Sequence, residues 1–249
     1  MVHLINAILL NFVCMGTHSI DQASIQPLVT IIHQELLPQL VVESVHPHNP
    51  AVVHHLPPPW ELIGTGNYAA VVCHPDFPNV VVKIYAPGRP GFDEELEVYN
   101  RIGSHPAYSQ CFYAYNGLLV LKRLFGVTLY DCLNRGLRIS PRVIKDIDRA
   151  LDYARSRGLF PHDVHGKNVM MFEGRGLVVD ISDFLHEDKC SKWEDLKKAY
   201  YLIYLPIFYP FKLRVPYSLL NRVRQSYRFI NSFSGKTLQL LKKLISQKF

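Results

Sequence analysis

The chain has 249 residues, of which 48% are hydrophobic and 19% are charged, and it carries a formal net charge of +6. This composition excludes an intrinsically disordered chain, and the length allows one domain of two lobes with a hydrophobic core. The five cysteines are scattered without a Cys-x-x-Cys pair, which excludes a disulfide framework and a cysteine zinc site. We therefore expect an intracellular protein with reduced thiols.

Residues 1–56 are expected to form an N-terminal extension that ends in a linker rich in proline and histidine. The apolar run from Leu4 to Met15 is too short to span a bilayer and lacks the basic start of a signal peptide, so we expect a cytoplasmic protein. Apolar residues at helical spacing predict a helix within residues 20–43. Four histidines then lie among prolines and predict a loop, not a metal site: His46, His48, His54 and His55.

The segment from residue 57 to residue 124 predicts strands and one helix. Gly64 and Gly66 would let a strand-turn-strand backbone lie close over phosphate groups, because neither has a side chain that could clash. Two such glycines also fit an ordinary hairpin turn. Further on, Lys83 interrupts a β-branched run, which predicts a buried strand whose charge requires a partner. An edge-strand lysine that reaches solvent is the alternative.

The partner of Lys83 should be an acidic residue on the helix predicted to follow. Three residues that lie three, four and seven positions after Glu95 share its helix face: Val98, Tyr99 and Ile102. We therefore predict a Lys83–Glu95 pair, with Glu94 as the second candidate. The strand after this helix, within residues 117–124, runs into a connection made of Leu121-Lys122-Arg123-Leu124.

Residues 126–133 predict a short helix, and a longer helix begins at Ser140, a capping residue that is followed by proline. Val143, Ile144, Ile147, Leu151 and Ala154 keep helical spacing along it. Gly158 marks its end. The long helix thus delivers the chain into the loop that carries the most informative motif.

That loop contains Asp163 and, five residues later, Asn168, and Asp180 follows a short apolar run. Asp163 can accept a hydroxyl proton, while Asn168 and Asp180 can supply the oxygen ligands that Mg²⁺ prefers. Each of the three could also stabilise a turn or cap a strand. Their order after Lys83 and Glu95 favours a site for phosphoryl transfer.

In this order, the motifs resemble those of the protein kinase-like superfamily over roughly residues 58–205. The resemblance implies an α+β fold of two lobes. Residues 57–124 would form a small antiparallel sheet with one helix and end in the hinge, and residues 125–211 would form a minimal, mostly helical lobe. It also implies that the substrate ATP binds between the lobes and that Mg²⁺ is the cofactor.

The resemblance assigns roles residue by residue. Lys83, fixed by Glu95, would hold the α- and β-phosphates, Asn168 and Asp180 would hold Mg²⁺, and Asp163 would be the base for the acceptor hydroxyl. The residues around ATP would be Ile63, Gly64, Gly66, Val71, Lys83, Leu121, Lys122, Arg123 and Leu124. The function implied is an ATP-dependent phosphotransferase, similar to serine/threonine protein kinases of a small, divergent bacterial type.

The chain also departs from the kinase pattern. Pro161 and His162 replace the His-Arg of His-Arg-Asp, and His165 stands where protein kinases usually have lysine, which is more similar to aminoglycoside and choline phosphotransferases. Lys167 is the candidate for the missing cation near the γ-phosphate, or else an exposed loop lysine. Ile181 and Ser182 replace the Phe-Gly that usually follows the metal-binding aspartate, a divergence shared with RIO-type kinases.

These departures leave three functions open. No Ala-Pro-Glu motif follows Asp180, so a full peptide-binding platform is not expected. The acceptor hydroxyl could therefore belong to a protein serine or threonine or to a small molecule. A pseudokinase that serves as a binding module is the third alternative, favoured by Pro161 but not by the retention of the catalytic set.

Residues 212–249 are expected to form a basic helical tail. No acidic residue follows Asp195, whereas lysines and arginines accumulate. A helical stripe is formed by Leu219, Leu220, Val223, Tyr227 and Ile230. The tail could be a lobe helix with a solvated basic face, or it could bind an anionic partner: a membrane surface, a nucleic acid or an acidic substrate. No specific nucleic-acid motif is present.

Overall fold

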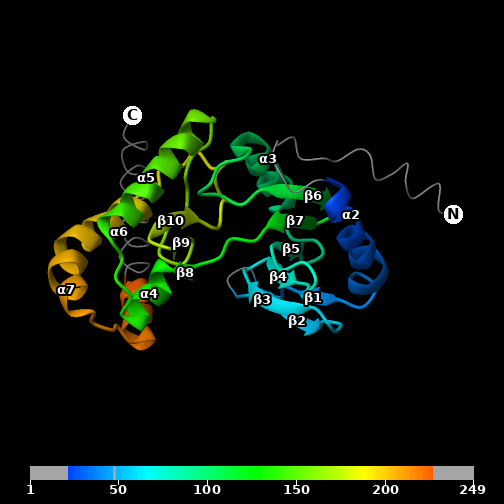
Figure 1. Cartoon of the computed structure of the whole chain (residues 1–249), viewed down its shortest axis with the longest axis horizontal. Coiled ribbons are helices and arrows are strands. Elements are labelled where there is room, and N and C mark those ends of the chain that lie inside the picture. The colour runs from blue at the N-terminus through cyan, green and yellow to red at the C-terminus, as the bar shows by residue number, and fades with distance from the viewer. Residues whose placement is uncertain (1–21, 47–48, 227–249) are drawn as a thin grey trace, which may run out of the picture.

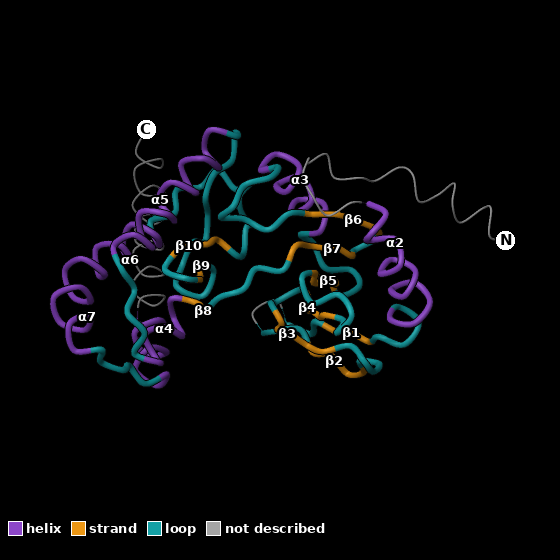
Figure 2. The backbone as a smooth tube through the Cα atoms, viewed as in Figure 1, coloured by secondary structure: helices purple, strands orange, loops and turns teal. Residues whose placement is uncertain are grey.

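The computed structural model describes residues 22–46 and 49–226. It has an α+β fold of two lobes, as predicted (Figure 1). One lobe holds a five-stranded sheet, a two-stranded hairpin and two helical segments, and the other lobe is mostly helix and loop with a small three-stranded sheet (Figure 2). The apolar run Leu4 to Met15 lies outside the described residues. Among the residues described, none of the helices is long and apolar enough to cross a membrane.

The first lobe is built on a five-stranded antiparallel sheet. In spatial order its strands are β3 (Glu61–Thr65), β4 (Ala69–Cys73), β5 (Val80–Tyr85), β7 (Leu118–Lys122) and β6 (Cys111–Tyr115). Helix α3 (Phe92–Ile102) connects β5 to β6 in the chain and packs beside β6. Apart from Lys83 on β5, the inner residues of the central strands are mostly apolar on both faces, because successive residues of a strand point to opposite sides and both sides are covered.

Successive residues of β7 pack into two different cores, one on each face of the sheet. Leu119 and Leu121 join the main core, which also contains residues of α3 and of the helical lobe. Leu118 and Val120 join a second core with α2 (Gln22–Ile31) and the π-helical turn η1 (Ile32–Leu36). The helix predicted within residues 20–43 is thus observed as α2 and η1, and it folds against the sheet.

The prediction of a loop for the histidine-rich stretch is wrong in part. His54 and His55 belong to β2 (Val52–His55), which pairs with β1 (Val41–Glu43) in an antiparallel hairpin. His54 Nε2 lies 2.8 Å from Glu43 Oε2 across this hairpin. The prolines that suggested a loop bracket the strand, and two consecutive valines within it favour extended backbone. His48 lies outside the described residues.

The second lobe contains the predicted short and long helices as α4 (Leu129–Arg135) and α5 (Pro141–Ser156). It also contains α6 (Lys192–Ala199), the π-helical η2 (Tyr200–Phe208) and the single turn α7 (Tyr209–Phe211). A three-stranded sheet lies beside them, in the order β10 (Arg175–Val178), β9 (Val169–Phe172) and β8 (Val127–Thr128). All the apolar residues predicted along the long helix are buried.

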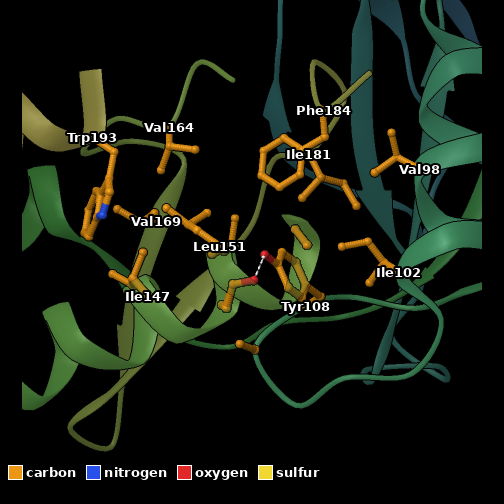
Figure 3. Packing of buried hydrophobic residues seen from close by; sticks show 14 of the residues in the cluster. Val98, Ile102, Tyr108, Ile147, Leu151, Val164, Val169, Ile181, Phe184 and Trp193 are labelled. Atoms are coloured by element: carbon orange, nitrogen blue, oxygen red, sulfur yellow. Dashed lines mark hydrogen bonds between the residues drawn. The ribbon is translucent and has the colours of Figure 1, made fainter. Parts of the chain in front are cut away.

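The lobes share one core at their junction. Tyr108 packs near Leu151 and Phe184, and its hydroxyl donates a hydrogen bond of 2.7 Å to the Ala150 carbonyl oxygen (Figure 3). The Tyr153 hydroxyl donates to Ile102 O at 2.8 Å. These bonds tie α5 to the end of α3 and to the segment after it, so they fix the helix that carries Glu95 relative to the second lobe.

Residues 212–226 fold back onto α4. Val215 N donates to Leu133 O at 3.0 Å, Asn134 Nδ2 donates to Val215 O at 3.2 Å, and residues 217–226 are helical. Along the predicted stripe, Leu219 and Val223 are exposed. Tyr227 and Ile230 lie outside the described residues.

Candidate active site

A buried ion pair joins β5 to α3. Lys83 Nζ lies 2.6 Å from Glu95 Oε2, and the carboxylate of Glu95 is 1% exposed. The Tyr85 hydroxyl donates to the same oxygen, because Tyr85 is two residues along the strand and points to the same face as Lys83. Glu94 instead accepts a hydrogen bond of 3.1 Å from Gly91 N at the start of α3. The structure therefore pairs Lys83 with the first of the two predicted candidates.

Lys83 is the cation between two carboxylates. Burial works to lower its pKa, but the negative charges of Glu95 and Asp180 outweigh burial and raise the pKa above the ordinary lysine value. Burial alone would raise the pKa of Asp180, but Lys83 and hydrogen bonds from Ser182 hold it below the ordinary range. Lys83 is thus an ammonium and Asp180 a carboxylate at neutral pH.

Asp180 follows β10 and its conformation is fixed by Ser182. Asp180 Oδ1 accepts hydrogen bonds from Ser182 N at 3.3 Å and from Ser182 Oγ at 3.0 Å. Val179 N donates to Asn168 O at 2.9 Å, which fastens the end of β10 to the preceding loop. Ser182 therefore stabilises the carboxylate at the position where the kinase pattern has glycine.

Asn168 and Asp163 are held in one loop. Asn168 Nδ2 donates to Asp163 O at 3.1 Å, so Oδ1 is the side-chain atom with which Asn168 could ligate a metal. Asp163 has a left-handed backbone, with φ of 53°. Asn168 Oδ1 and Asp180 are a donor set suited to Mg²⁺ that also binds substrate phosphates. Among the described residues, this site included, no three His, Cys, Asp or Glu side chains converge as a metal cluster.

The sequence is similar to that of a known protein over about half of the chain. No protein-family profile matches the chain. It is 31% identical over 121 residues to the Bacillus subtilis (strain 168) protein named "Putative serine/threonine-protein kinase YrzF". The match covers 48% of this chain and 56% of that protein, so the chain spans about half the length of the curated relative that it matches. Over the matched residues the chain is thus similar to a protein that is named as a serine/threonine kinase.

Two solved structures are also similar to this kinase-like chain. Both are kinase domains of Mycobacterium tuberculosis PknI, one with a cysteine-to-alanine substitution and one with an additional arginine-to-alanine substitution. They are 26% and 23% identical to the chain, each with a TM-score of 0.38 over 49% of it. The matches cover 57% and 56% of those domains.

The glycine loop of this kinase-like chain is the β3–β4 hairpin, in which Gly66 N donates to Ala69 O at 2.8 Å. A Cβ added to Gly64 would meet no described atom within 4 Å, and one added to Gly66 would meet only Ala69 O at 3.9 Å. Neither glycine has a positive φ. Packing and backbone conformation therefore do not require glycine at these two positions.

The other residues expected around the nucleotide occupy β3, β4 and the end of β7. Val71 pairs with Lys83 across β4 and β5, which places both on one face of the sheet, while Ile63 is exposed on β3. Leu121 is buried, and the Lys122 carbonyl oxygen accepts a hydrogen bond of 2.7 Å from Ser109 Oγ. Of these residues, Leu121 joins the core that both lobes share.

A residue that sequence analysis missed contacts the candidate base. Lys192, the first residue of α6, donates a hydrogen bond from Nζ to Asp163 Oδ1. His165 Nε2 lies 3.9 Å from the other carboxylate oxygen, and His165 Nδ1 accepts a hydrogen bond of 3.3 Å from Lys167 N. Burial lowers the pKa of His165, which outweighs the opposite effect of Asp163 and keeps the imidazole neutral. Lys192 is thus the cation at the carboxylate of Asp163.

Lys167 is placed elsewhere in the kinase-like site. Its ammonium lies 4.7 Å from the centre of the Tyr130 ring. It lines a cavity of about 260 Å³ together with Thr128, Tyr130, Asp131, Tyr217 and Asn221. The last two residues belong to the helical segment 217–226, and Asn221 Oδ1 accepts a hydrogen bond of 2.7 Å from the Tyr130 hydroxyl. The C-terminal segment therefore forms one wall of a cavity beside the loop of Asp163 and Asn168.

Proposed function

We propose that this chain is an ATP-dependent phosphotransferase that moves the γ-phosphate of Mg·ATP to a hydroxyl group, as serine/threonine protein kinases do. One observation carries the proposal: half-buried Lys83 is paired with buried Glu95, and the negative charges of Glu95 and Asp180 hold it in its charged form. A buried cation costs free energy unless it is paired, and its placement beside a metal-type carboxylate suits phosphate binding. The name of the Bacillus subtilis relative supports the same reaction class.

Each residue of the site has a role in this proposal. Lys83 binds the α- and β-phosphates, and the β3–β4 hairpin with Gly64 and Gly66 covers them. Asn168 and Asp180 hold Mg²⁺, which when bound neutralises phosphate charge. Asp163 orients the acceptor hydroxyl and takes its proton, so most of the rate acceleration comes from positioning and charge stabilisation. ATP as substrate favours a cytoplasmic location for the enzyme.

Lys192 has a positioning role in the same proposal. It orients the carboxylate of Asp163 through its hydrogen bond to Oδ1. Its ammonium also places a positive charge beside the carboxylate that meets the acceptor, where negative charge develops during transfer. Lys167, the sequence candidate for a cation near the γ-phosphate or else an exposed loop lysine, lies against Tyr130, so we assign it to the acceptor side of the site.

The direct test measures nucleotide binding before any acceptor is known. Mg·ATP at saturation should raise the thermal midpoint of the wild-type chain by several degrees. The shift should be lost in Asp180→Asn and kept in Asp188→Asn, a matched change at an exposed aspartate. Absence of a Mg²⁺-dependent shift in the wild type would refute the proposal. Asp163→Ala should keep the shift but lose phosphoryl transfer.

The cavity beside Lys167 favours a second candidate, a phosphotransferase for a small hydroxylated molecule. Its walls offer a carboxylate, an ammonium, hydroxyls and stacked tyrosine rings, with Tyr130 and Tyr217 centred 5.8 Å apart. Such a mixture suits a compact polar ligand better than an extended peptide. A screen with radiolabelled ATP against both proteins and hydroxylated metabolites separates the two. Transfer to metabolites that Asn221→Ala abolishes would establish the second candidate.

A further inference from the structure

The helical segment from Tyr200 to Phe211 is anchored to the protein by one side. Tyr200 and Tyr204 are buried, and both hydroxyls bond to the backbone just before α5. The Tyr200 hydroxyl donates to Ile139 O at 2.8 Å, and the Tyr204 hydroxyl accepts from Ile139 N at 2.8 Å. These contacts fix which side of η2 and α7 faces outward.

The outward side is apolar. We call it the outer apolar face, and it consists of Leu202, Ile203, Ile207, Phe211 and Leu213, all exposed. Leu202 and Phe211 are 74% and 72% exposed, although no charged residue occurs from residue 199 to residue 211. The exposed side of a helix in water is normally polar. Single exposed apolar residues are common and need no explanation. A group of several exposed apolar residues on one helical segment, in contrast, indicates a binding surface.

Basic residues lie beside this face, on the segment that follows α7 and at Arg138. Lys212 and Arg214 are exposed in and beside the turn that follows α7, and Arg138 donates to the carbonyl oxygens of Tyr209 and Pro210 at 3.1 and 3.0 Å. No aspartate or glutamate occurs from residue 196 to residue 249. An apolar face rimmed by lysine and arginine is the pattern that binds the interface of anionic membranes.

We propose that the outer apolar face docks on the surface of an anionic lipid bilayer. Leu202, Phe211 and their neighbours would enter the boundary between headgroups and acyl chains, and Lys212 and Arg214 would contact the headgroups. In Figure 1, α7 lies at the end of the helical lobe far from the five-stranded sheet, so docking leaves the junction of the lobes accessible. A nucleic acid would use the positive charge but would leave the apolar side chains exposed, so the bilayer fits both features.

Co-sedimentation of the full chain with lipid vesicles tests this inference. Vesicles of equal parts phosphatidylcholine and phosphatidylglycerol should bind the chain, and vesicles of phosphatidylcholine alone should bind it at least tenfold more weakly. The variant Leu202→Ser/Phe211→Ser should lose at least tenfold in binding. A matched variant in the other lobe, Val41→Ser/Val45→Ser, replaces two apolar residues that are also exposed and should bind as the wild type does.

Each other outcome overturns the inference. If the wild type does not bind vesicles that contain phosphatidylglycerol, the outer apolar face is not a membrane site. The same conclusion follows if Leu202→Ser/Phe211→Ser and Val41→Ser/Val45→Ser bind these vesicles equally. Equal binding to both vesicle types removes the role of anionic lipid. A wild-type dimer that Leu202→Ser/Phe211→Ser converts to monomer without vesicles would instead make the face a protein interface. Thermal midpoints with Mg·ATP, measured on the same samples, show that the variants fold and test the proposed function separately.

Discussion

Lys192 and Asp163 form a hydrogen bond across 29 residues of sequence, and this contact connects α6 to the catalytic loop. Lys192 begins α6, whose Trp193 packs in the core and donates from Nε1 to Asp148 Oδ1 at 2.8 Å. The start of the helix is therefore fixed, and with it the ammonium that Asp163 contacts. Lys192, which follows Asp180 in the chain, thereby supplies a cation at the carboxylate of Asp163. Lys167, in the loop of Asp163, lies against Tyr130 instead.

The first prediction concerns the rate of phosphoryl transfer. Lys192→Met should lower kcat roughly 100-fold with little change in the KM for ATP, because it removes a charge that acts in the transition state. Lys167→Met is the matched control and should change the acceptor KM more than kcat. Lys192→Arg keeps a positive charge and should therefore have a higher kcat than Lys192→Met. If the lower rate of Lys192→Met came from misfolding, retaining the charge would not be expected to restore it. Equal kcat values for wild type and Lys192→Met would contradict the role.

A chemical probe gives a second prediction that requires no known acceptor. In an ATP derivative with an acyl group on the γ-phosphate, a nearby lysine amine attacks the acyl carbon, forms an amide and releases ATP. We expect acylation of Lys192 and not of Lys167, as measured by mass spectrometry of the digested protein. Excess Mg·ATP should suppress the reaction. Labelling of Lys167 in preference to Lys192 would reverse the assignment of the two lysines.

The third prediction concerns the stability of the first lobe. Glu95→Gln should lower the free energy of unfolding by about 3 kcal/mol, because it leaves half-buried Lys83 without its closest counter-charge. Glu94→Gln, at an exposed carboxylate of the same helix, should have a much smaller effect. Lys83→Met/Glu95→Leu should recover most of the loss in urea unfolding, since it removes both buried charges. A double variant less stable than Glu95→Gln would contradict this account.

Local periodicity explains why the Lys83–Glu95 pair could be predicted from the sequence. A lysine within a β-branched strand and a glutamate on the apolar stripe of a helix must both face the interior. A charge in the interior is stabilised only by a partner of opposite charge, so the two side chains are expected to pair. The long helix was predictable for the same reason, since its spacing and its Ser-Pro start are local signals. The composition of β2 was misleading, because the prolines that flank it masked a strand of four residues.

Contacts that depend on the path of loops could not be predicted. Lys192 reaches Asp163 because of how residues 181–191 turn after β10, and no periodic signal in the sequence encodes that turn. The cavity beside Lys167 likewise depends on residues 212–216 folding back onto α4, through backbone hydrogen bonds of Val215 that any residue except proline could make. In both cases the partners are distant in sequence and their residue types are ordinary.

The fourth prediction concerns pH. Burial lowers the pKa of His105, and the pKa values of His33 and His165 are lowered too. The unfolded chain binds protons on these histidines near their ordinary pKa of about 6.5, whereas the folded chain binds them only at lower pH. The free energy of unfolding should therefore fall as pH drops below about 6.5. Urea unfolding of wild type at neutral and mildly acidic pH measures this loss.

His105 offers a variant for the pH effect. Its ring stacks on Tyr153 with centroids 4.3 Å apart, and its Nδ1 accepts a hydrogen bond of 3.2 Å from Ala107 N. His105→Gln can keep an acceptor but cannot gain the ring proton, so the loss of stability on acidification should be smaller than in wild type. His55→Gln, at an exposed histidine, is the control for the substitution itself. An unchanged slope in His105→Gln would exclude this histidine as a source.

The last prediction separates packing from ligand binding at glycines. Gly64→Ala should leave the free energy of unfolding nearly unchanged, because its Cβ would meet no described atom within 4 Å and its φ is not positive. It should nevertheless reduce the thermal shift caused by Mg·ATP, since the added methyl would project where the phosphates are proposed to lie. Gly176→Ala provides the contrast: its Cβ would collide with the Val143 carbonyl oxygen, so it should destabilise the chain by about 2 kcal/mol or more. If Gly64→Ala kept the full shift at subsaturating Mg·ATP, the hairpin would not cover the phosphates, and Gly64 and Gly66 would mark an ordinary turn.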